Sequence, residues 1–228
     1  MKHHFVSIRR ILMLTVLCTV LLQTKAISQT TIGRQKVDQY PITPWGTPTY
    51  GLTWLPADYN SSNQKYPLII FLHGRGETGD GVGGLYNLIS TALPQKIAQG
   101  WDPQAVNPAD GQNYQFIVVS PQAPSASGWS YQYGHIQFIL KDVMSRYRVD
   151  PDRVYVTGLS AGGAGTWSCV TNGPEGAKKF AAIVPVSSAG LNYGSETDSI
   201  QHAGSRYGVK VWQVCGAEDA WYSFVNTS

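Results

Sequence analysis

Continuous apolar runs alternate with helical patterns along most of this 228-residue chain. Leu68–Leu72 and Phe116–Val119 contain only apolar residues, which is typical of strands that are buried on both faces of a sheet. Leu85–Gln99 has a helical pattern that Pro94 interrupts, and apolar residues recur at helical spacing over 136–147. Strands that alternate with helices predict an α/β fold, with a mostly parallel sheet that helices cover on both faces.

The same patterns set the limits of the predicted domain. Residues 48–228 are expected to form one α/β domain, and residues 29–47, which carry no clear element, are expected to form an amino-terminal extension. Beyond the two apolar runs, further strands are predicted at Thr49–Leu55, Val154–Val156, Ala181–Val186 and Val209–Val214.

Residues 1–28 have the pattern of an export signal. A basic start with Arg9 and Arg10 precedes the apolar run Ile11–Leu22, and Ala26 and Ser28 offer small residues for cleavage. The run is shorter than the roughly 20 residues of a membrane-spanning helix, and no stop-transfer pattern follows it, which disfavours an uncleaved anchor. We therefore expect a secreted or periplasmic bacterial protein that has no membrane span after signal cleavage.

Removing this segment changes the charge of the chain. It holds four of the 17 basic residues and none of the 14 acidic ones, so 13 basic side chains face 14 acidic ones in the remainder. The net charge of +3 therefore belongs to the export signal. The mature chain lacks the basic excess on which nucleic-acid binding depends.

Two cysteines follow the export signal, and the predicted fold separates them. Cys169 lies in the helix after residue 160, about 13 Å along its axis, whereas Cys215 ends a strand at the opposite edge of the sheet. Because a disulfide needs Cα atoms within about 7 Å, two buried free thiols are favoured over a bridge. The histidines and cysteines also lack metal-ligand spacing, so no metal or organic cofactor is implied.

The candidate nucleophile lies where the strand Val154–Val156 runs into Gly158-Leu159-Ser160-Ala161-Gly162. This G-x-S-x-G pattern is typical of a sharp strand-to-helix turn that strains the serine backbone and exposes its Oγ. The same turn directs the N–H of Ala161 toward the oxygen of a substrate carbonyl.

A second oxyanion donor is predicted in a glycine-rich loop. His73-Gly74-Arg75-Gly76 follows the buried strand Leu68–Leu72, where backbone N–H groups can face the turn at Ser160. We expect the N–H of Arg75 to act together with that of Ala161. His73 is less suited to be the catalytic base than to hold the loop, because it lies at the end of the strand, ahead of the glycines.

The acid of a catalytic triad is expected at the carboxyl end of a strand after the nucleophile. Asp219 is the preferred candidate because it lies further into the loop after Val209–Val214 than the alternative, Glu218. A solvated acidic turn without a catalytic role is the third interpretation.

The triad histidine is the missing member. In this arrangement the histidine follows the acid, yet no histidine occurs between Ala220 and Ser228. His202 precedes the acid and would require a rearranged triad. We therefore expect the chain to be truncated at its carboxyl terminus, with its last elements and its catalytic histidine beyond residue 228.

Six segments together carry a resemblance to a known family: Pro67–Glu77, Val119–Gln122, Trp129, Asp150–Gly163, Phe180–Ala182 and Val211–Asp219. They resemble exported esterases of the α/β-hydrolase fold, often labelled predicted peptidases and akin to feruloyl, acetyl-xylan and polyhydroxybutyrate depolymerase-type esterases. The resemblance implies Ser160 as nucleophile, Asp219 as triad acid, and Arg75 with Ala161 as oxyanion donors. The absent histidine-containing loop departs from the family pattern.

The predicted activity is that of a secreted serine carboxylesterase acting on polysaccharide-linked or similar small esters. Trp129 and Trp221 are expected to line the mouth of the site, because aromatic faces suit sugar rings and aromatic acyl groups. Two alternatives remain open, a serine peptidase of the same fold and a non-catalytic carbohydrate-binding relative. The other tryptophans considered are expected in the core: Trp45, Trp54, Trp167 and Trp212.

Overall fold

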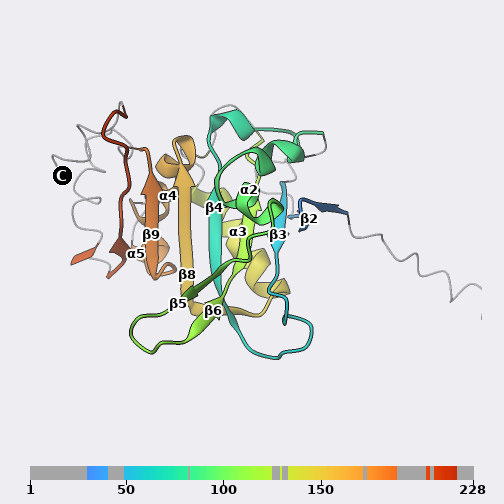
Figure 1. The fold of residues 1–228 in the computed structure, drawn as a ribbon. Coiled ribbons are helices and arrows are strands. Elements are labelled where there is room, and N and C mark those ends of the chain that lie inside the picture. Colours follow the sequence, from blue (N-terminus) through green and yellow to red (C-terminus); the bar gives the residue numbers. More distant parts are fainter. Residues whose placement is uncertain are drawn as a thin grey trace, which may run out of the picture.

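The centre of the molecule is an eight-stranded, mostly parallel sheet (Figure 1). The computed structural model describes residues 30–40, 49–81, 83–124, 129, 133–171, 174–188, 204–205 and 208–219. Five strands run parallel to one another, and three at one edge pair antiparallel. In spatial order the strands are β1 (Thr31–Ile32), β2 (Gln35–Gln39), β3 (Tyr50–Trp54), β7 (Ile117–Pro121), β4 (Tyr66–Leu72), β8 (Val149–Leu159), β9 (Ala182–Val186) and β10 (Lys210–Val211).

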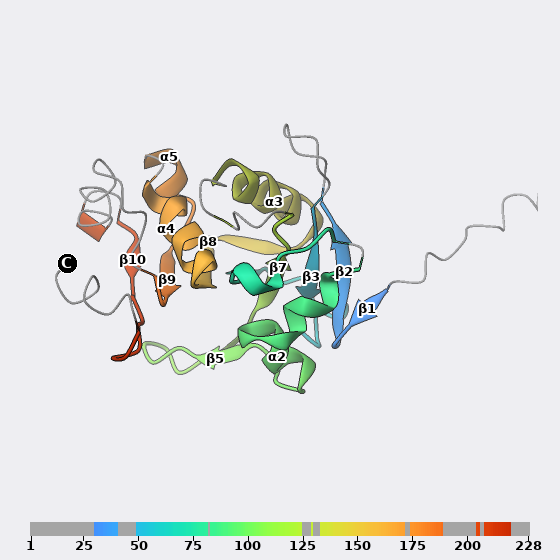
Figure 2. The ribbon, with the colours of Figure 1, turned by 90° about the horizontal axis from the view of Figure 1, so that it is seen from above.

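Helices cover both faces of this sheet, as the sequence pattern predicted. Seen from above, α3 (Tyr133–Arg146), α4 (Ala161–Thr171) and α5 (Pro174–Ala177) lie on one side, and α2 (Ala92–Ala98) lies on the other (Figure 2). The helical pattern over 85–99 is divided as predicted, but the division lies at Thr91 and not at Pro94: a 3₁₀ helix η2 (Leu85–Ser90) ends before α2. Pro94 lies in the first turn of α2, where its missing N–H is tolerated. A small hairpin, β5 (Gln104–Val106) and β6 (Asn113–Gln115), stands apart from the main sheet.

The two faces of the sheet are covered unequally. On the side of α3 and α4, Ile70, Val156 and Ile183 are fully buried in the main core. On the side of α2, Ile69, Thr157 and Val186 are only partly covered and line a hollow of about 530 Å³. Most of the apolar burial that stabilises the fold therefore lies beneath α3 and α4.

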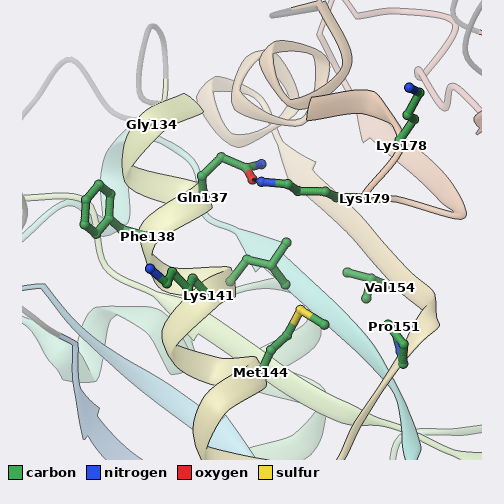
Figure 3. A pocket seen from close by; sticks show the side chains of 10 residues that line it. Gly134, Gln137, Phe138, Lys141, Met144, Pro151, Val154, Lys178 and Lys179 are labelled. Carbon is green, nitrogen blue, oxygen red and sulfur yellow. Dashed lines mark hydrogen bonds between the residues drawn. The ribbon is translucent and has the colours of Figure 1, made fainter. Parts of the chain in front are cut away.

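The helix layer also contains a groove of about 840 Å³ between α3 and the amino-terminal half of β8 (Figure 3). Leu140 and Met144 of α3 and Val154 of β8 form its apolar walls, and the Lys179 ammonium donates a hydrogen bond to Gln137 across one end.

Residues 31–39, which the sequence pattern assigned to an extension, form β1 and β2 and pair with β3 in the main sheet. That assignment is therefore wrong for these residues. The sequence of β2, Gln-Lys-Val-Asp-Gln, has no alternation of apolar and polar residues, because its buried positions are the polar Gln35 and Asp38. Hydrogen bonds to these two side chains stabilise the strand, and such bonds leave no periodic signal in the sequence.

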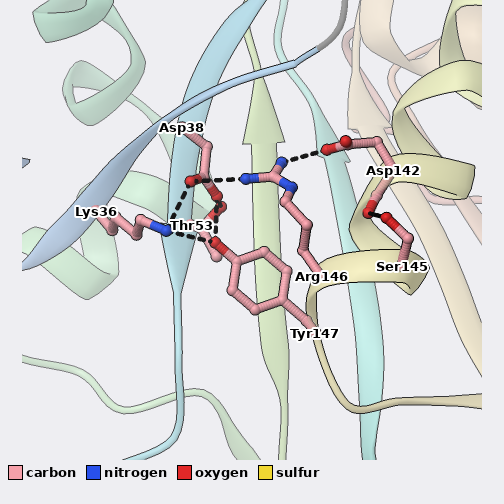
Figure 4. A network of polar contacts seen from close by, with 7 residues as sticks. All are labelled: Lys36, Asp38, Thr53, Asp142, Ser145, Arg146 and Tyr147. Atoms are coloured by element: carbon pink, nitrogen blue, oxygen red, sulfur yellow. Dashed lines mark hydrogen bonds and ion pairs between the residues drawn. The ribbon is translucent and has the colours of Figure 1, made fainter.

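Asp38 is the centre of a polar network that ties β2 to the end of α3 (Figure 4). Its carboxylate accepts hydrogen bonds of 2.5 Å from both the Thr53 and the Tyr147 hydroxyls, and it lies 3.0 Å from Lys36 Nζ and 3.1 Å from Arg146 Nη1. Burial alone would raise the pKa of Asp38, but these hydrogen bonds and the Arg146 charge together hold the pKa below its ordinary value. The buried carboxylate is therefore ionised and fully partnered.

The last strand is shorter than predicted. β10 covers only two residues of the expected strand Val209–Val214. Val214 nevertheless pairs with β9: its N–H donates to Pro185 O at 3.0 Å, and the residue forms an isolated parallel bridge with Val186. Trp212 is 73% exposed, so the expectation of a core position is wrong for this residue, whereas Trp167 is buried as expected.

Both cysteines carry free thiols, as predicted, and Cys169 is buried; Cys215 is partly exposed, so the expectation that both thiols are buried is wrong for Cys215. None of the helices within the described ranges has the length and apolar character that crossing a bilayer requires. The predicted export signal over 1–28 lies outside the described residues.

Candidate active site

Ser160 lies at the junction between β8 and α4 and has the strained backbone that the sequence pattern predicts. Its φ is +56°, in the left-handed region that residues other than glycine rarely adopt. The Ser160 N–H donates to Val186 O at 2.9 Å, which fixes the turn to the neighbouring strand β9. Backbone strain of this kind persists only where the surrounding structure holds it, and it concentrates at functional sites.

The glycines on either side of Ser160 allow α4 to pass very close to β4. A Cβ placed on Gly162 would lie 1.9 Å from Leu72 O, and one on Gly158 would lie 2.3 Å from Gly162 O. Both are far inside the contact distance of carbon and oxygen. The G-x-S-x-G pattern is thus explained by the close approach of three backbone segments.

Gly162→Ala is expected to destabilise the protein by about 3 kcal/mol, because the new methyl group meets backbone that cannot move without shifting β4. Gly83→Ala is the control, since a Cβ at Gly83 would meet nothing within 4 Å. Urea unfolding of both variants measures the difference. Equal stability of the two variants would contradict this explanation of the glycine pattern.

The glycine-rich loop after β4 lies beside Ser160. A Cβ built on Gly74 would be 3.9 Å from Ser160 Cβ and 3.2 Å from Glu77 Oε2. Arg75 begins the short 3₁₀ helix η1 (Arg75–Glu77), and Ala161 begins α4. The first N–H groups of a helix have no partner within it, so these two residues meet one requirement for oxyanion donors.

His73 holds this loop through both of its ring nitrogens. Nε2 accepts a hydrogen bond of 2.8 Å from the Ala123 N–H, so Nδ1 carries the hydrogen and donates to Gly74 O at 2.5 Å. Burial lowers the pKa of His73, which keeps the ring neutral. With its lone pair already engaged, His73 cannot take a proton from Ser160, in agreement with the structural role predicted from the sequence.

His135 is also unsuited to be the base. Its ring is buried, Nε2 is hydrogen-bonded to the Thr49 hydroxyl, and burial lowers its pKa. His73 and His135 are the histidines of the described part of the chain, while His202 lies outside it. The described residues therefore supply no histidine that could act as the base for Ser160.

Asp219 follows the strand segment next to β9, at the carboxyl edge of the sheet where Ser160 also lies. Val214 bridges to Val186, whose carbonyl accepts the Ser160 N–H, and Asp219 comes five residues later. The turn is held by a hydrogen bond of 3.0 Å from the Asp219 N–H to Gly216 O. Asp219 is partly buried and the alternative Glu218 is exposed, which favours Asp219 as the acid.

The two predicted substrate contacts have different outcomes. Trp129 is 0% exposed, and its ring packs edge-on to His73, with ring centroids 5.3 Å apart. The Trp129 indole therefore packs in the core against His73, at the start of the glycine-rich loop. The expectation that Trp129 lines the mouth of the site is wrong. Trp221 lies outside the described residues. The groove in Figure 3 does not include Ser160 or the glycine-rich loop, so it is separate from this site.

Comparison with known proteins identifies the fold. No family model and no curated protein matches the sequence. Among solved structures, the feruloyl esterase module from Clostridium thermocellum aligns with a TM-score of 0.60 at 19% identity, over 88% of this chain and 75% of that one. A thermostable esterase aligns with a TM-score of 0.52 at 21% identity, over 86% of this chain.

S-formylglutathione hydrolase from Staphylococcus aureus aligns with a TM-score of 0.52 at 16% identity, over 85% of this chain and 84% of that one. The chain spans 60% of the length of the thermostable esterase. These proteins share the α/β-hydrolase fold, and the present chain has the same fold, as predicted. At such identities the likeness concerns the fold, and the activity has to be argued from the site.

Proposed function

We propose that the protein is an exported serine hydrolase that cleaves carboxylic esters through an acyl-enzyme on Ser160. The observation that carries the proposal is the strained backbone of Ser160, with φ of +56°, at a strand-to-helix turn beside the loop of Gly74 and Arg75. A strained serine at such a turn, beside a loop that can supply a backbone N–H group, supports a role in acyl transfer.

In the proposed reaction, Ser160 Oγ attacks the ester carbonyl and gives its proton to a base that lies outside the described residues. The N–H groups of Arg75 and Ala161 stabilise the oxyanion, and Asp219 orients the base. Collapse of the tetrahedral intermediate breaks the bond to the alcohol oxygen, which receives the proton from the base. Water then attacks the acyl group, and the carboxylic acid leaves while Ser160 regains its proton.

The proposed substrates are esters attached to polysaccharides, or small esters of similar shape. Support comes from the feruloyl esterase module among the structures of the same fold. The pattern of an export signal over 1–28 supports action outside the cytoplasm.

A fluorophosphonate probe and a pair of chromogenic substrates test this function. The full-length protein is expected to be labelled on Ser160, as located by peptide mass spectrometry, and to hydrolyse p-nitrophenyl acetate but not peptide p-nitroanilides. Cleavage of the peptides without ester turnover would favour a peptidase. Absence of labelling would favour the non-catalytic carbohydrate-binding alternative. A binding assay with insoluble xylan would then test that alternative.

A further inference from the structure

The glycine-rich loop is folded around one buried side chain, that of Gln122. Gln122 directly follows β7, is 1% exposed, and is anchored by a hydrogen bond of 2.8 Å from its N–H to Tyr50 O. Its side-chain Nε2 donates to Glu77 O and to Gly84 O, both at 2.8 Å, and its Oε1 accepts the Gly81 N–H at 3.0 Å. One amide group thus binds the loop at three points.

These three bonds define the orientation of the Gln122 amide. Two carbonyl oxygens face one of its ends and an N–H faces the other, so a rotated amide would set its oxygen against both carbonyls. Both N–H groups of the side chain are used. No other side chain of similar length offers two donors and one acceptor in a neutral planar group.

The glycines of the loop are explained by the same contact. A Cβ on Gly79 would lie 2.7 Å from Gln122 Nε2, and one on Gly84 would lie 3.3 Å from the same atom. The backbone therefore packs directly on the amide plane. The loop is rich in glycine because it encloses a glutamine side chain, in addition to passing close to Ser160.

Glu77 connects this contact to the reaction site. It is the last residue of η1, whose first residue is Arg75, so the bond from Gln122 to Glu77 O fixes the turn that carries the Arg75 N–H. On the other side of the loop, Ala123 O accepts the Gly79 N–H at 3.1 Å, and the Ala123 N–H donates to His73. Gln122 and Ala123 together connect the end of β7 to both ends of the loop.

We infer that Gln122 is a positioning residue that sets the Arg75 N–H for the oxyanion, an inference that rests on the proposed function. Gln122 does not reach the reacting atoms. It acts through Glu77 O and the 3₁₀ turn, so its loss is expected to slow the chemical step while substrate binding changes little.

Gln122→Met tests the inference, because methionine keeps the length and loses all three hydrogen bonds. We expect kcat for p-nitrophenyl acetate to fall about 100-fold, with KM within about threefold of the wild type. Gln35→Met is the matched control: Gln35 is also fully buried, and its Nε2 donates to Gly33 O at 3.3 Å and Pro94 O at 3.1 Å, away from Ser160. This control is expected to keep kcat within about twofold.

A second variant disturbs the contact between Gln122 and the loop by a substitution in the loop itself. In Gly79→Ala the new methyl group displaces the Gln122 amide, so the same fall in kcat at unchanged KM is expected even if Gln122→Met folds poorly. A wild-type kcat in folded Gln122→Met would overturn the inference and leave the proposed function standing. A fall in kcat of the same size in Gln35→Met would do the same. Absence of Ser160 labelling in the wild-type protein would overturn the proposed function and the inference together.

Discussion

Ser160→Gly is expected to abolish ester hydrolysis and at the same time to make the protein more stable. Loss of Ser160 removes the proposed acyl-enzyme route, and loss of the nucleophile in serine hydrolases lowers kcat by about 10⁶-fold. Glycine adopts a φ of +56° without the steric cost that a serine bears, so the free energy of unfolding is expected to rise by about 1 kcal/mol. The p-nitrophenyl acetate assay and thermal unfolding measure the two effects.

Two controls separate the loss of the hydroxyl from the release of strain. Ser160→Ala removes the hydroxyl and keeps a Cβ, so activity is lost without a gain in stability. Ala92→Gly, at another positive φ of +48°, is expected to gain stability and to keep its activity. If Ser160→Gly is no more stable than Ser160→Ala, the strained turn is not the source of the effect.

Asp38→Asn is expected to be the most destabilising of the substitutions away from the site, at about 3 kcal/mol near pH 7. The asparagine amide would place a donor against groups that already donate, and it would leave Lys36 and Arg146 without their buried partner. The value is at the low end for a buried ion pair, because those two side chains are about one third exposed, at 30% and 32%. Urea unfolding measures it. Glu175→Gln, which breaks an exposed pair with Lys178, is expected to cost less than about 0.5 kcal/mol.

The pH dependence of this difference follows from the direction of the pKa shift. Because the pKa of Asp38 is lower in the folded than in the unfolded protein, the unfolded state binds the proton more readily. The stabilisation is fully present above the unfolded pKa of about 3.9 and is lost as the pH falls through the folded pKa. The stability gap between wild type and Asp38→Asn should therefore shrink below about pH 4. A gap that stays constant from pH 7 to pH 3 would contradict the network.

The sequence predicted those parts of the fold that depend on apolar patterning. The run Leu68–Leu72 lies within β4, Phe116–Val119 overlaps β7, and the G-x-S-x-G turn lies between β8 and α4. Continuous apolar runs are typical of buried parallel strands, and the glycines around Ser160 are required by a close approach of backbone segments.

The features that the sequence did not reveal depend on polar side chains that form hydrogen bonds with residues far away in the sequence. β2 was missed because Asp38 occupies a buried position, and the role of Gln122 was missed because its partners Glu77 and Gly84 are about 40 residues away. The spacing of the glycines at 79, 81 and 84 was the available signal. Trp129 was predicted at the mouth of the site, but it is buried, because an aromatic residue after a strand fits the core as well as the wall of a site.

The network around Asp38 also has a consequence for how the chain reaches its native state. Asp38 lies 108 residues before Arg146 in the sequence, and its strand has little apolar surface of its own. A contact between residues so far apart in the sequence costs loop-closure entropy. The edge formed by β1 and β2 is therefore expected to become stable only after α3 has folded. During synthesis, β1 and β2 are therefore expected to join the sheet only after α3 has emerged, although they are the first elements of the domain to be made.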